Sequence, residues 1–307
     1  MALSKNQYLL NYRKNVESQF GEDGIIEQIF STIGIKHGIC CEFGAWDGRH
    51  LSNTYNLIAN KGWSAVLIEG NKSRFPQLQK TFEENPKVVA VNKYVGFSGD
   101  DLLDNILSSH NVPKNIDFLS IDIDGNDYHI WDSLQLYTPK VVVIEFNPFI
   151  PADVEFVQKR DPNVQHGTSI LSMTKLALKK GYQLICINQE NAFYVQKKYF
   201  GRFKIKDNSI QELKHYKEPL KVFQLYDGTL VFQGAQYLYY YNFAYDFNKH
   251  FQVLPEVIRR DNLPWGGRGI TSKILYKVLK FLKMRHDEKP EDCWAWKTVY
   301  DNFNTRI

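Results

Sequence analysis

Cysteine is scarce in this chain and occurs in no metal-binding pattern. The 307 residues include four cysteines, at positions 40, 41, 186 and 293, and no two of them form a C-x-x-C pair. This spacing provides no zinc-finger site. Three of the four lie within apolar, strand-like runs, so we expect buried thiols in a reducing compartment.

Long hydrophobic runs are also missing. The N-terminal segment, M-A-L-S-K-N-Q-Y-L-L, has no apolar stretch of the kind found in signal peptides, and Glu145 interrupts the most apolar run, residues 141–150. We therefore expect a soluble, cytoplasmic protein.

No excess of charge points to a particular partner. The formal net charge is +4, with 43% hydrophobic and 23% charged residues, which is typical of a globular protein. A balance this close to neutral gives no reason to expect nucleic acid binding. The chain also has no internal repeat and no low-complexity tract.

What the chain does contain is a regular alternation of Val/Ile-rich runs and helix-like segments. This alternation is typical of parallel strands joined by crossover helices, an α/β fold. The expected strands are 38–43, 64–69, 87–92, 116–123, 140–146 and 182–187, and the expected helices are 22–33, 52–60, 73–84, 100–109, 128–134 and 168–180.

A seventh strand is expected at 192–196, immediately after the sixth. Only residues 188–191 separate the two, and four residues cannot contain a crossover helix. The pair must therefore be an antiparallel hairpin. A mostly parallel sheet that ends in such a hairpin is the Rossmann-like plan of the seven-stranded methyltransferases.

The composition changes after residue 200, which suggests an N-terminal segment at 1–20, a main domain at 21–200 and a C-terminal α+β extension at 201–307. Residues 221–232 predict a β-hairpin with Asp227-Gly228 at its turn. The tyrosine-rich stretch 237–245 fits core packing, a sugar-stacking surface or a homo-oligomer interface.

Residues 272–286 predict a basic amphipathic helix in this extension. Such a helix either packs its apolar face on its own domain or makes peripheral contact with an anionic membrane. Both alternatives remain open.

The first predicted strand runs into a glycine-containing acidic loop, C-E-F-G-A-W-D-G at 41–48. Gly44 and Gly48 allow backbone to approach a ligand closely at the carboxyl end of the sheet. The loop is not the G-x-G-x-x-G of dinucleotide-binding proteins, and its acidic residues suit a cationic sulfonium better than a pyrophosphate. Glu69, at the tip of the second strand, is placed to accept the hydroxyls of a ribose.

Acidic and amide side chains also end the fourth and fifth predicted strands. Asp122 and Asp124 occur in L-S-I-D-I-D-G-N-D-Y, and Glu145 and Asn147 in V-I-E-F-N. Alternation along each strand predicts that both members of a pair share a face. Carboxylates this close must share a proton, bind a cation or be hydrogen-bonded. Oxygen ligands favour Mg²⁺, Mn²⁺ or Ca²⁺. Without a metal, Asp122 and Asp124 would cap the next helix, bond the Gly-Asn turn, or bind the cofactor amine and the acceptor hydroxyls.

Several ordered motifs resemble those of the FkbM-type methyltransferases over roughly residues 15–200. They are S-Q-F-G-E-D-G (18–24), E-F-G-A-W-D-G-R-H-L-S-N-T (42–54), L-I-E-G-N (67–71), S-I-D-I-D-G-N-D-Y (120–128), V-I-E-F-N (143–147) and H-G-T-S-I (166–170). The resemblance implies a class I fold, S-adenosyl-L-methionine as methyl donor, and O-methylation of a sugar or another small hydroxylated acceptor.

By position, the resemblance implies roles for individual residues. The cofactor would contact Glu42, Gly44 and Asp47 on its methionine side, Glu69 at its ribose, and residues 95–101, including Asp101, around its adenine. Among the acidic strand ends, our own hypothesis places Asp122 nearer the cofactor. The motif 18–24 would be a lid from which Gln19 and Glu22 reach the site, or simply a helix start.

The expected metal ligands are Asp124, Glu145 and Asn147, an arrangement similar to that of catechol O-methyltransferase. The catalytic candidates are Asp124 and His166, the latter as general base because histidine titrates near neutral pH. His50 and His129 are further candidates.

The sequence therefore predicts an O-methyltransferase acting on a small-molecule or glycan hydroxyl, assisted by Mg²⁺ or Mn²⁺. A nucleotide-sugar-dependent glycosyltransferase, which also needs acidic residues and a metal, is the first alternative. A non-catalytic binding subunit that keeps the fold is the second.

Overall fold

A computed structural model describes residues 3–216, 220–225, 229–234, 237–238, 243–244 and 251. The chain divides into two units, Met1–Pro219 and Leu220–Ile307, and each is described by itself. The predicted boundaries at residues 20 and 200 remain predictions.

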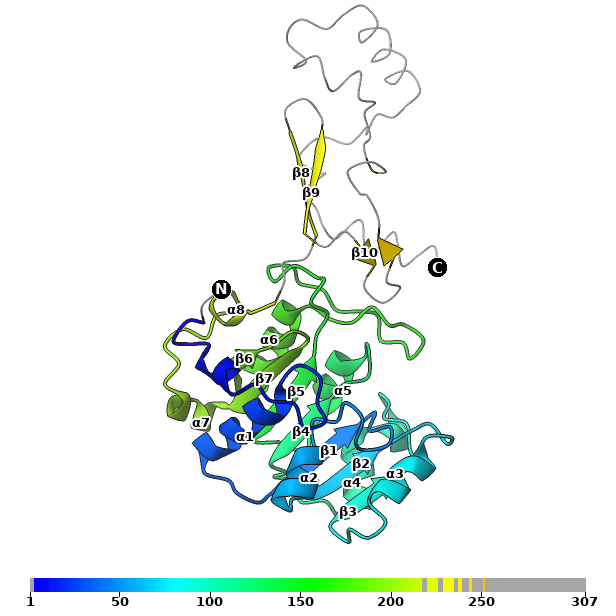
Figure 1. The fold of residues 1–307 in the computed structure, drawn as a ribbon. Helices are drawn as coiled ribbons and strands as arrows, with labels where there is room; N and C mark the ends of the chain where they lie inside the picture. The colour runs from blue at the N-terminus through cyan, green and yellow to red at the C-terminus, as the bar shows by residue number, and fades with distance from the viewer. Residues whose placement is uncertain are drawn as a thin grey trace, which may run out of the picture. The chain divides into compact units, whose positions relative to one another are not determined.

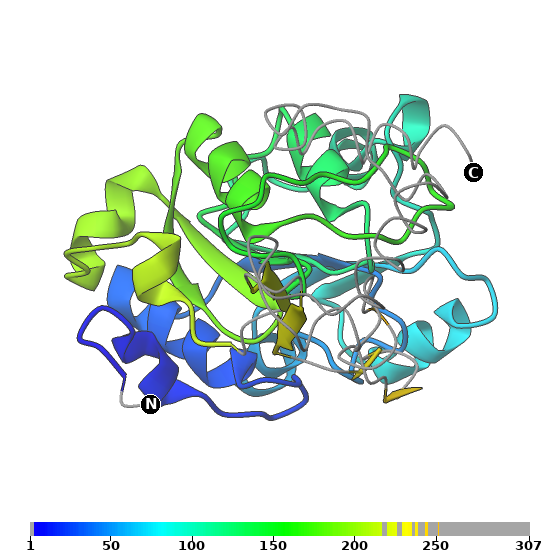
Figure 2. The ribbon, with the colours of Figure 1, turned by 90° about the horizontal axis from the view of Figure 1, so that it is seen from above.

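A seven-stranded sheet forms the centre of the first unit (Figures 1 and 2). Its order is β3-β2-β1-β4-β5-β7-β6, and every pair is parallel except those of β7, which is antiparallel to β5 and β6. This confirms the predicted Rossmann-like sheet and its terminal hairpin. The strands are β1 (Ile39–Phe43), β2 (Ser64–Ile68), β3 (Val88–Val91), β4 (Phe118–Ile121), β5 (Val141–Glu145), β6 (Tyr182–Ile187) and β7 (Asn191–Gln196).

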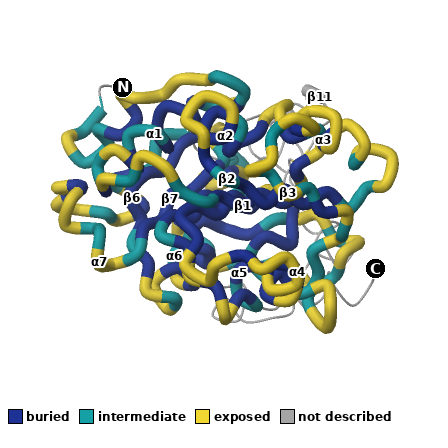
Figure 3. Tube along the Cα trace, turned by 90° about the horizontal axis from the view of Figure 1, so that it is seen from below, coloured by how far each residue is buried: buried dark blue, intermediate teal, exposed yellow. Residues whose placement is uncertain are grey.

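Helices cover both faces of this sheet. In Figure 3, α1, α2 and α3 lie on one side of the buried strands and α4, α5 and α6 on the other. Their bounds are α1 (Glu22–Ile33), α2 (Tyr55–Lys61), α3 (Phe75–Thr81), α4 (Leu103–Ser109), α5 (Asp127–Ser133) and α6 (Ile170–Lys179). Short elements complete the unit: α7 (Lys197–Phe200), α8 (Ile210–Leu213), and the 3₁₀ turns η1 (Tyr8–Tyr12), η2 (Gly99–Asp101) and η3 (Gly201–Phe203).

The Val/Ile-rich runs become central strands because helices bury them on both faces. All four residues of β4 are buried, as are residues 141–144 of β5. Cys40, Cys41 and Cys186 are buried free thiols in this core, and burial raises the pKa of each. Within the described residues, no helix combines the length and apolar character needed to cross a membrane.

The second unit contains two antiparallel strand pairs. In the first pair, β8 (Lys221–Gln224) is joined to β9 (Leu230–Gln233), which confirms the predicted hairpin. In the second, β10 (Tyr237–Leu238) is joined to β11 (Phe243–Ala244). The predicted Asp227-Gly228 turn, the amphipathic helix 272–286 and Cys293 lie outside the described residues.

The chain order of the strands reverses between β1 and β4, which are neighbours at the centre of the sheet. Gly44 follows β1 at this point with φ 74°, and a Cβ built there would lie 2.7 Å from the backbone oxygen of Asp122, just after β4. The sequence suggested that this glycine makes room for a ligand. The structure shows a second reason, since the two strand ends themselves approach too closely for a side chain.

Replacing Gly44 with alanine should destabilise the protein more than the same change at Gly99. Both glycines have positive φ, 74° and 59°, so each alanine carries a backbone cost of about 1 kcal/mol. A Cβ at Gly99 has no atom within 4 Å, whereas at Gly44 the clash with backbone should add about 2 kcal/mol. Urea unfolding measures both losses. Equal losses would contradict the close approach of β1 and β4.

Candidate active site

The loop after β1 is held by the buried carboxylate of Glu42. This carboxylate accepts hydrogen bonds from the hydroxyls of Ser52 (2.6 Å) and Thr54 (2.7 Å) and from the backbone N–H of Asn53 (2.9 Å). Burial nevertheless raises its pKa. These contacts fix residues 52–54 directly before α2 begins at Tyr55. The predicted cofactor ligand Glu42 therefore uses its carboxylate to shape the loop.

Glu69 joins the loops that follow β1 and β2. Its Oε2 accepts the backbone N–H of Trp46 (2.8 Å) and its Oε1 accepts that of Asn71 (2.6 Å), and the residue is buried. A carboxylate oxygen has two lone pairs, so each oxygen keeps one for a further donor. Glu69 can accept ribose hydroxyls while it holds both loops together.

The other two acidic residues predicted to contact the cofactor are nearer the surface. Asp47 is half-buried, and its Oδ1 accepts the backbone N–H groups of Arg49 (2.9 Å) and His50 (2.7 Å). Asp101 is exposed and lies 3.5 Å from the ammonium of Lys93. Both carboxylates therefore have partners within their own loops.

The acidic loop after β4 has an unusual backbone. Strand β4 ends at Ile121, two residues earlier than expected, and Asp124 adopts the left-handed conformation with φ 58°. The carboxylate of Asp127 accepts the N–H of Ile123 at Oδ1 (3.0 Å) and that of Gly125 at Oδ2 (2.9 Å). These two bonds bracket Asp124. Strand alternation was therefore the wrong reason to expect Asp122 and Asp124 together, because neither lies in the strand.

Three carboxylates converge at this edge of the sheet. Oxygens of Asp122, Asp124 and Glu145 all lie within 4.8 Å of one another. Asp122 and Asp124 are exposed, and Glu145 is half-buried. Crowding by protein atoms partly desolvates Asp122 and Glu145, and this desolvation, followed by repulsion from neighbouring carboxylates, raises the pKa of each well above its usual range. Burial also raises the pKa of Asp127 to about 6, although the backbone hydrogen bonds that its carboxylate accepts lower that pKa.

Asn147, a predicted metal ligand, has other partners. Its amide nitrogen donates to the backbone oxygen of His166 (2.9 Å), and its side-chain oxygen accepts the N–H of Phe149 (2.9 Å). The structure brings the predicted ligands Asp124 and Glu145 together. The third member of the carboxylate group is Asp122, which the sequence placed nearer the cofactor.

His166 is exposed on a loop that reaches the end of β5. The side-chain oxygen of Gln158 accepts the N–H groups of His166 (2.8 Å) and Gly167 (2.8 Å), and Asn147 binds the loop from the other side. The backbone of the predicted base is thus fixed beside Asn147, two residues after the end of β5. The side chain of Gln158 is almost fully buried, and nothing in the sequence pattern indicated its role.

The two further catalytic candidates, His129 and His50, contact other protein groups. His129 donates from Nε2 to the backbone oxygen of Gln158 (2.8 Å), and its partial burial lowers its pKa. The ring of His50 lies edge-on to that of Trp46, with centroids 5.1 Å apart.

The motif 18–24 is hydrogen-bonded both to the segment before it and to the β6–β7 hairpin. Asp23 accepts three backbone N–H groups, from residues 16, 17 and 18, at one carboxylate oxygen. Glu22 is buried and accepts the amides of Asn188 and Asn191 from the β6–β7 connection. Of the two residues predicted to reach the site, Glu22 therefore uses its carboxylate for internal hydrogen bonds, whereas Gln19 is exposed.

Exposed aromatic side chains flank Glu69, and sequence reasoning missed them. The ring of Trp46, 37% exposed, lies 4.4 Å from the guanidinium carbon of Arg74. Tyr94 is 69% exposed, and its ring lies against Gly70, where an added Cβ would be 2.3 Å from it. Only the fold brings these aromatic faces next to the tip of β2.

No protein-family model and no curated protein matches the chain. Among solved structures, the N-terminal domain of EvdMO1 with SAH and D-fucose aligns with TM-score 0.40 and 10% identity, covering 57% of this chain and 82% of that one. Magnesium protoporphyrin IX methyltransferase (ChlM) from Synechocystis PCC 6803 aligns with TM-score 0.39 and 10% identity, covering 57% and 81%. A SAM-dependent methyltransferase from Aquifex aeolicus aligns with TM-score 0.37 and 9% identity, covering 62% and 98%.

Replacing Glu145 with glutamine should stabilise the ligand-free protein by about 1 kcal/mol at about pH 8, because it removes a partly desolvated charge and its repulsion by other carboxylates from a site that water partly screens. The folded state raises the pKa of Glu145 and so binds its proton more tightly than the unfolded state does. Wild-type stability therefore falls as pH rises through that raised pKa, and the advantage of the variant shrinks at lower pH.

Thermal unfolding at two pH values checks this expectation. Asp153→Asn is the matched control, because Asp153 is exposed and outside the carboxylate group, and it should change stability by less than about 0.5 kcal/mol. A Glu145→Gln protein that is less stable than wild type at the higher pH would contradict the assigned repulsion.

Proposed function

We propose that the chain is an S-adenosyl-L-methionine-dependent O-methyltransferase that acts on a hydroxyl of a sugar or glycan with the help of Mg²⁺ or Mn²⁺. The observation that carries the proposal is the arrangement at the reversal between β1 and β4. There Gly44 meets the backbone of Asp122, and Glu69 binds the N–H of Trp46. In an open α/β sheet, ligands bind at this kind of reversal, beyond the carboxyl ends of the strands.

The side chains around the reversal suit a cationic cofactor. Repulsion among Asp122, Glu145 and their neighbours adds to the effect of burial on their pKa values, and in the described part of the chain no lysine or arginine forms an ion pair with either of them. S-adenosylmethionine, when bound, would supply a methyl group on a sulfonium. Glu69 would accept its ribose hydroxyls, and Glu42 would keep the loop after β1 in shape.

The carboxylate group suits a divalent cation for the same reason. Oxygen donors from three side chains are a typical partial ligand set for Mg²⁺ or Mn²⁺, the remaining positions being left for water or substrate. Asp124 and Glu145 are common to the predicted set and to the observed group, and Asp122 completes the group in preference to Asn147. A bound cation would lower the pKa of an acceptor hydroxyl.

The chain's own residues would then align the acceptor and remove its proton. His166 is the proposed base, because Asn147 and Gln158 fix its backbone beside the end of β5. Asp124, held by the Asp127 bracket, is the second candidate to contact the hydroxyl. Alignment and proton removal are the main contributions that such a single displacement requires.

Calorimetry should show binding of S-adenosylmethionine to the purified chain, and no binding of nucleotide sugars with or without Mn²⁺. In a separate titration, Glu145→Gln should weaken Mn²⁺ binding by at least about tenfold, since it loses a direct ligand. Asp153→Asn should bind Mn²⁺ as wild type does.

The outcomes separate the competing functions. Binding of a nucleotide sugar in place of S-adenosylmethionine would favour a glycosyltransferase. Cofactor binding without any methylated product, in a mass-spectrometric screen of sugar acceptors, would favour a non-catalytic subunit. Unaltered Mn²⁺ binding by Glu145→Gln would remove the metal site and leave the cofactor assignment standing.

With an acceptor from that screen, His166→Gln should lower kcat by about 10²-fold and remove the limb of the pH–rate profile that reports the base. His37→Gln is the matched control, because His37 is also exposed but follows α1, outside the loops at the carboxyl ends of the strands. Steady-state rates across pH measure both variants. An unchanged turnover and pH profile in His166→Gln would exclude it as the base.

A further inference from the structure

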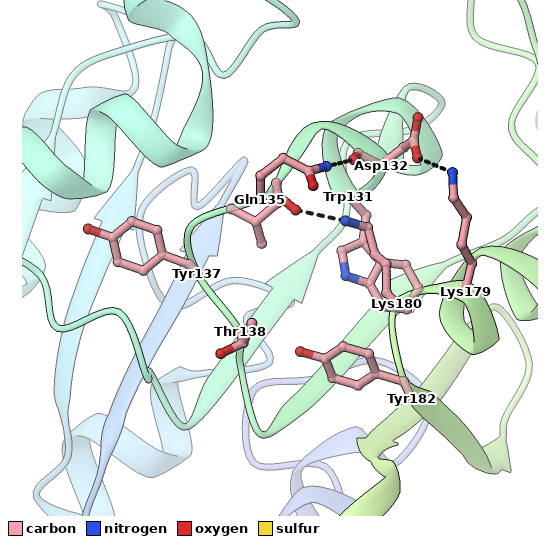
Figure 4. A pocket seen from close by; sticks show the side chains of 9 residues that line it. Trp131, Asp132, Gln135, Tyr137, Thr138, Lys179, Lys180 and Tyr182 are labelled. Atoms are coloured by element: carbon pink, nitrogen blue, oxygen red, sulfur yellow. Dashed lines mark hydrogen bonds and ion pairs between the residues drawn. The ribbon is translucent and has the colours of Figure 1, made fainter.

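A hollow lies at the opposite end of the strands from the acidic group. It has a volume of about 260 Å³, and its lining comes from the end of α5, the segment before β5, the end of α6 and the start of β6. Strands β5 and β6, which run in the same direction on either side of β7, begin at this end, whereas the acidic group lies where β4 and β5 end. The proposed methyl transfer uses none of these side chains (Figure 4).

A buried tryptophan forms one wall with an unused hydrogen-bond donor. Trp131 is 1% exposed and packs its ring against Tyr182 and Tyr194, with centroids 5.6 and 5.4 Å apart. In Figure 4 its indole nitrogen faces the space that Gln135, Tyr137 and Thr138 border. No hydrogen bond from this N–H to a protein acceptor occurs among the described residues, and the nitrogen is open to the pocket, so a ligand there can accept it.

A half-buried lysine provides positive charge beside this donor. The ammonium of Lys180 donates one hydrogen bond, to the backbone oxygen of Leu134 (2.7 Å), and an ammonium has three N–H groups. Burial lowers the pKa of Lys180, and the carboxylates of Asp132 and Asp104 oppose this lowering only in part. An anion in the pocket would oppose it further. Lys179 lies on the rim, 3.8 Å from Asp132, the only acidic side chain of the lining.

Three other polar side chains of the wall, those of Tyr137, Tyr182 and Gln135, donate hydrogen bonds within the protein. The hydroxyls of Tyr137 and Tyr182 both donate to backbone oxygens, of Val112 and Pro139. The amide nitrogen of Gln135 donates to the backbone oxygen of Asp132 (2.7 Å). Two donors of this wall lie next to the flat faces of Trp131 and Tyr182 and can act together on one ligand: the indole N–H of Trp131 and the remaining N–H groups of Lys180.

We propose that this pocket binds a small organic carboxylate with a planar apolar body. The carboxylate oxygens would accept hydrogen bonds from Trp131 Nε1 and Lys180 Nζ, and the planar part would lie along the aromatic wall. A charge-assisted hydrogen bond to Lys180 favours an anion over a neutral ligand. The site is independent of the proposed methyl transfer and lies beyond the other end of α5.

Benzoate and inorganic phosphate are suitable probes for the full-length chain labelled with ¹⁵N in its tryptophan side chains. Trp131→Phe assigns the Trp131 indole resonance by its disappearance. Benzoate should shift that resonance saturably and leave the other indole resonances in place, at ionic strength held constant with sodium chloride. Phosphate, which has the charge but no planar body, should bind at least about tenfold more weakly.

Three lysine variants test the assigned contacts. Lys180→Met should weaken benzoate binding by about tenfold, whereas Lys180→Arg, which keeps charge and donors, should retain it within about threefold. Lys179→Met is the matched control and should stay within about twofold of wild type, because Lys179 pairs with Asp132 at the rim.

Four results would overturn the proposal. The first is an indole shift that sodium chloride alone reproduces, and the second is the absence of a saturable shift. The third is phosphate binding as tight as benzoate binding, which would show that the planar body of the ligand contributes nothing to affinity. The fourth is equal weakening in Lys179→Met and Lys180→Met, which would indicate a diffuse charge effect in place of a built contact.

Discussion

Two hydrogen bonds to the carboxylate of Asp127 hold the candidate active site in shape. They come from the backbone N–H groups of Ile123 and Gly125, on either side of Asp124. A left-handed aspartate costs about 1 to 2 kcal/mol, and hydrogen bonds to a charged acceptor contribute about 1.5 to 3 kcal/mol each, so the bracket offsets the strain. Without these two hydrogen bonds, nothing described in the loop after β4 would hold the Asp124 side chain near Asp122 and Glu145.

The same site concentrates negative charge that the fold itself does not neutralise. Partial desolvation and repulsion between carboxylates raise the pKa values of Asp122 and Glu145, and the strands that they follow or end are almost fully buried. The stability of the ligand-free protein therefore depends on the apolar strands, while the carboxylates oppose it. A site that is destabilising without a ligand is typical of residues kept for binding or chemistry.

Helix α5 connects two edges of the sheet that have opposite electrostatic character. Its first residue, Asp127, holds the acidic loop, and Trp131, near its last turn, forms a wall of the pocket that contains Lys180. The carboxyl edge offers acceptors and negative charge, whereas the opposite edge offers donors and positive charge. The ligands that we propose for the two edges accordingly have opposite sign, a cationic methyl donor and a metal ion at one and an organic anion at the other.

The sequence by itself determined the sheet, because each strand depends on a local Val/Ile-rich run and the antiparallel pair β6–β7 on a connection too short for a helix. It also located Gly44, Glu69 and the acidic strand ends, since side chains at those places have a fixed position in this topology. The tertiary structure alone decided which groups meet. Asp122 takes the place expected for Asn147 because of a left-handed residue and two loop contacts.

The roles of Glu42, Gln158 and Trp131 were equally hidden in the sequence. Glu42 binds side chains ten to twelve positions away, Gln158 binds the His166 loop, and Trp131 meets Lys180 only after α5 and α6 pack on the sheet. Such contacts depend on side-chain directions in loops and between helices. Periodicity fixes those directions inside strands and helices, but not at their ends, where both candidate sites of this protein lie.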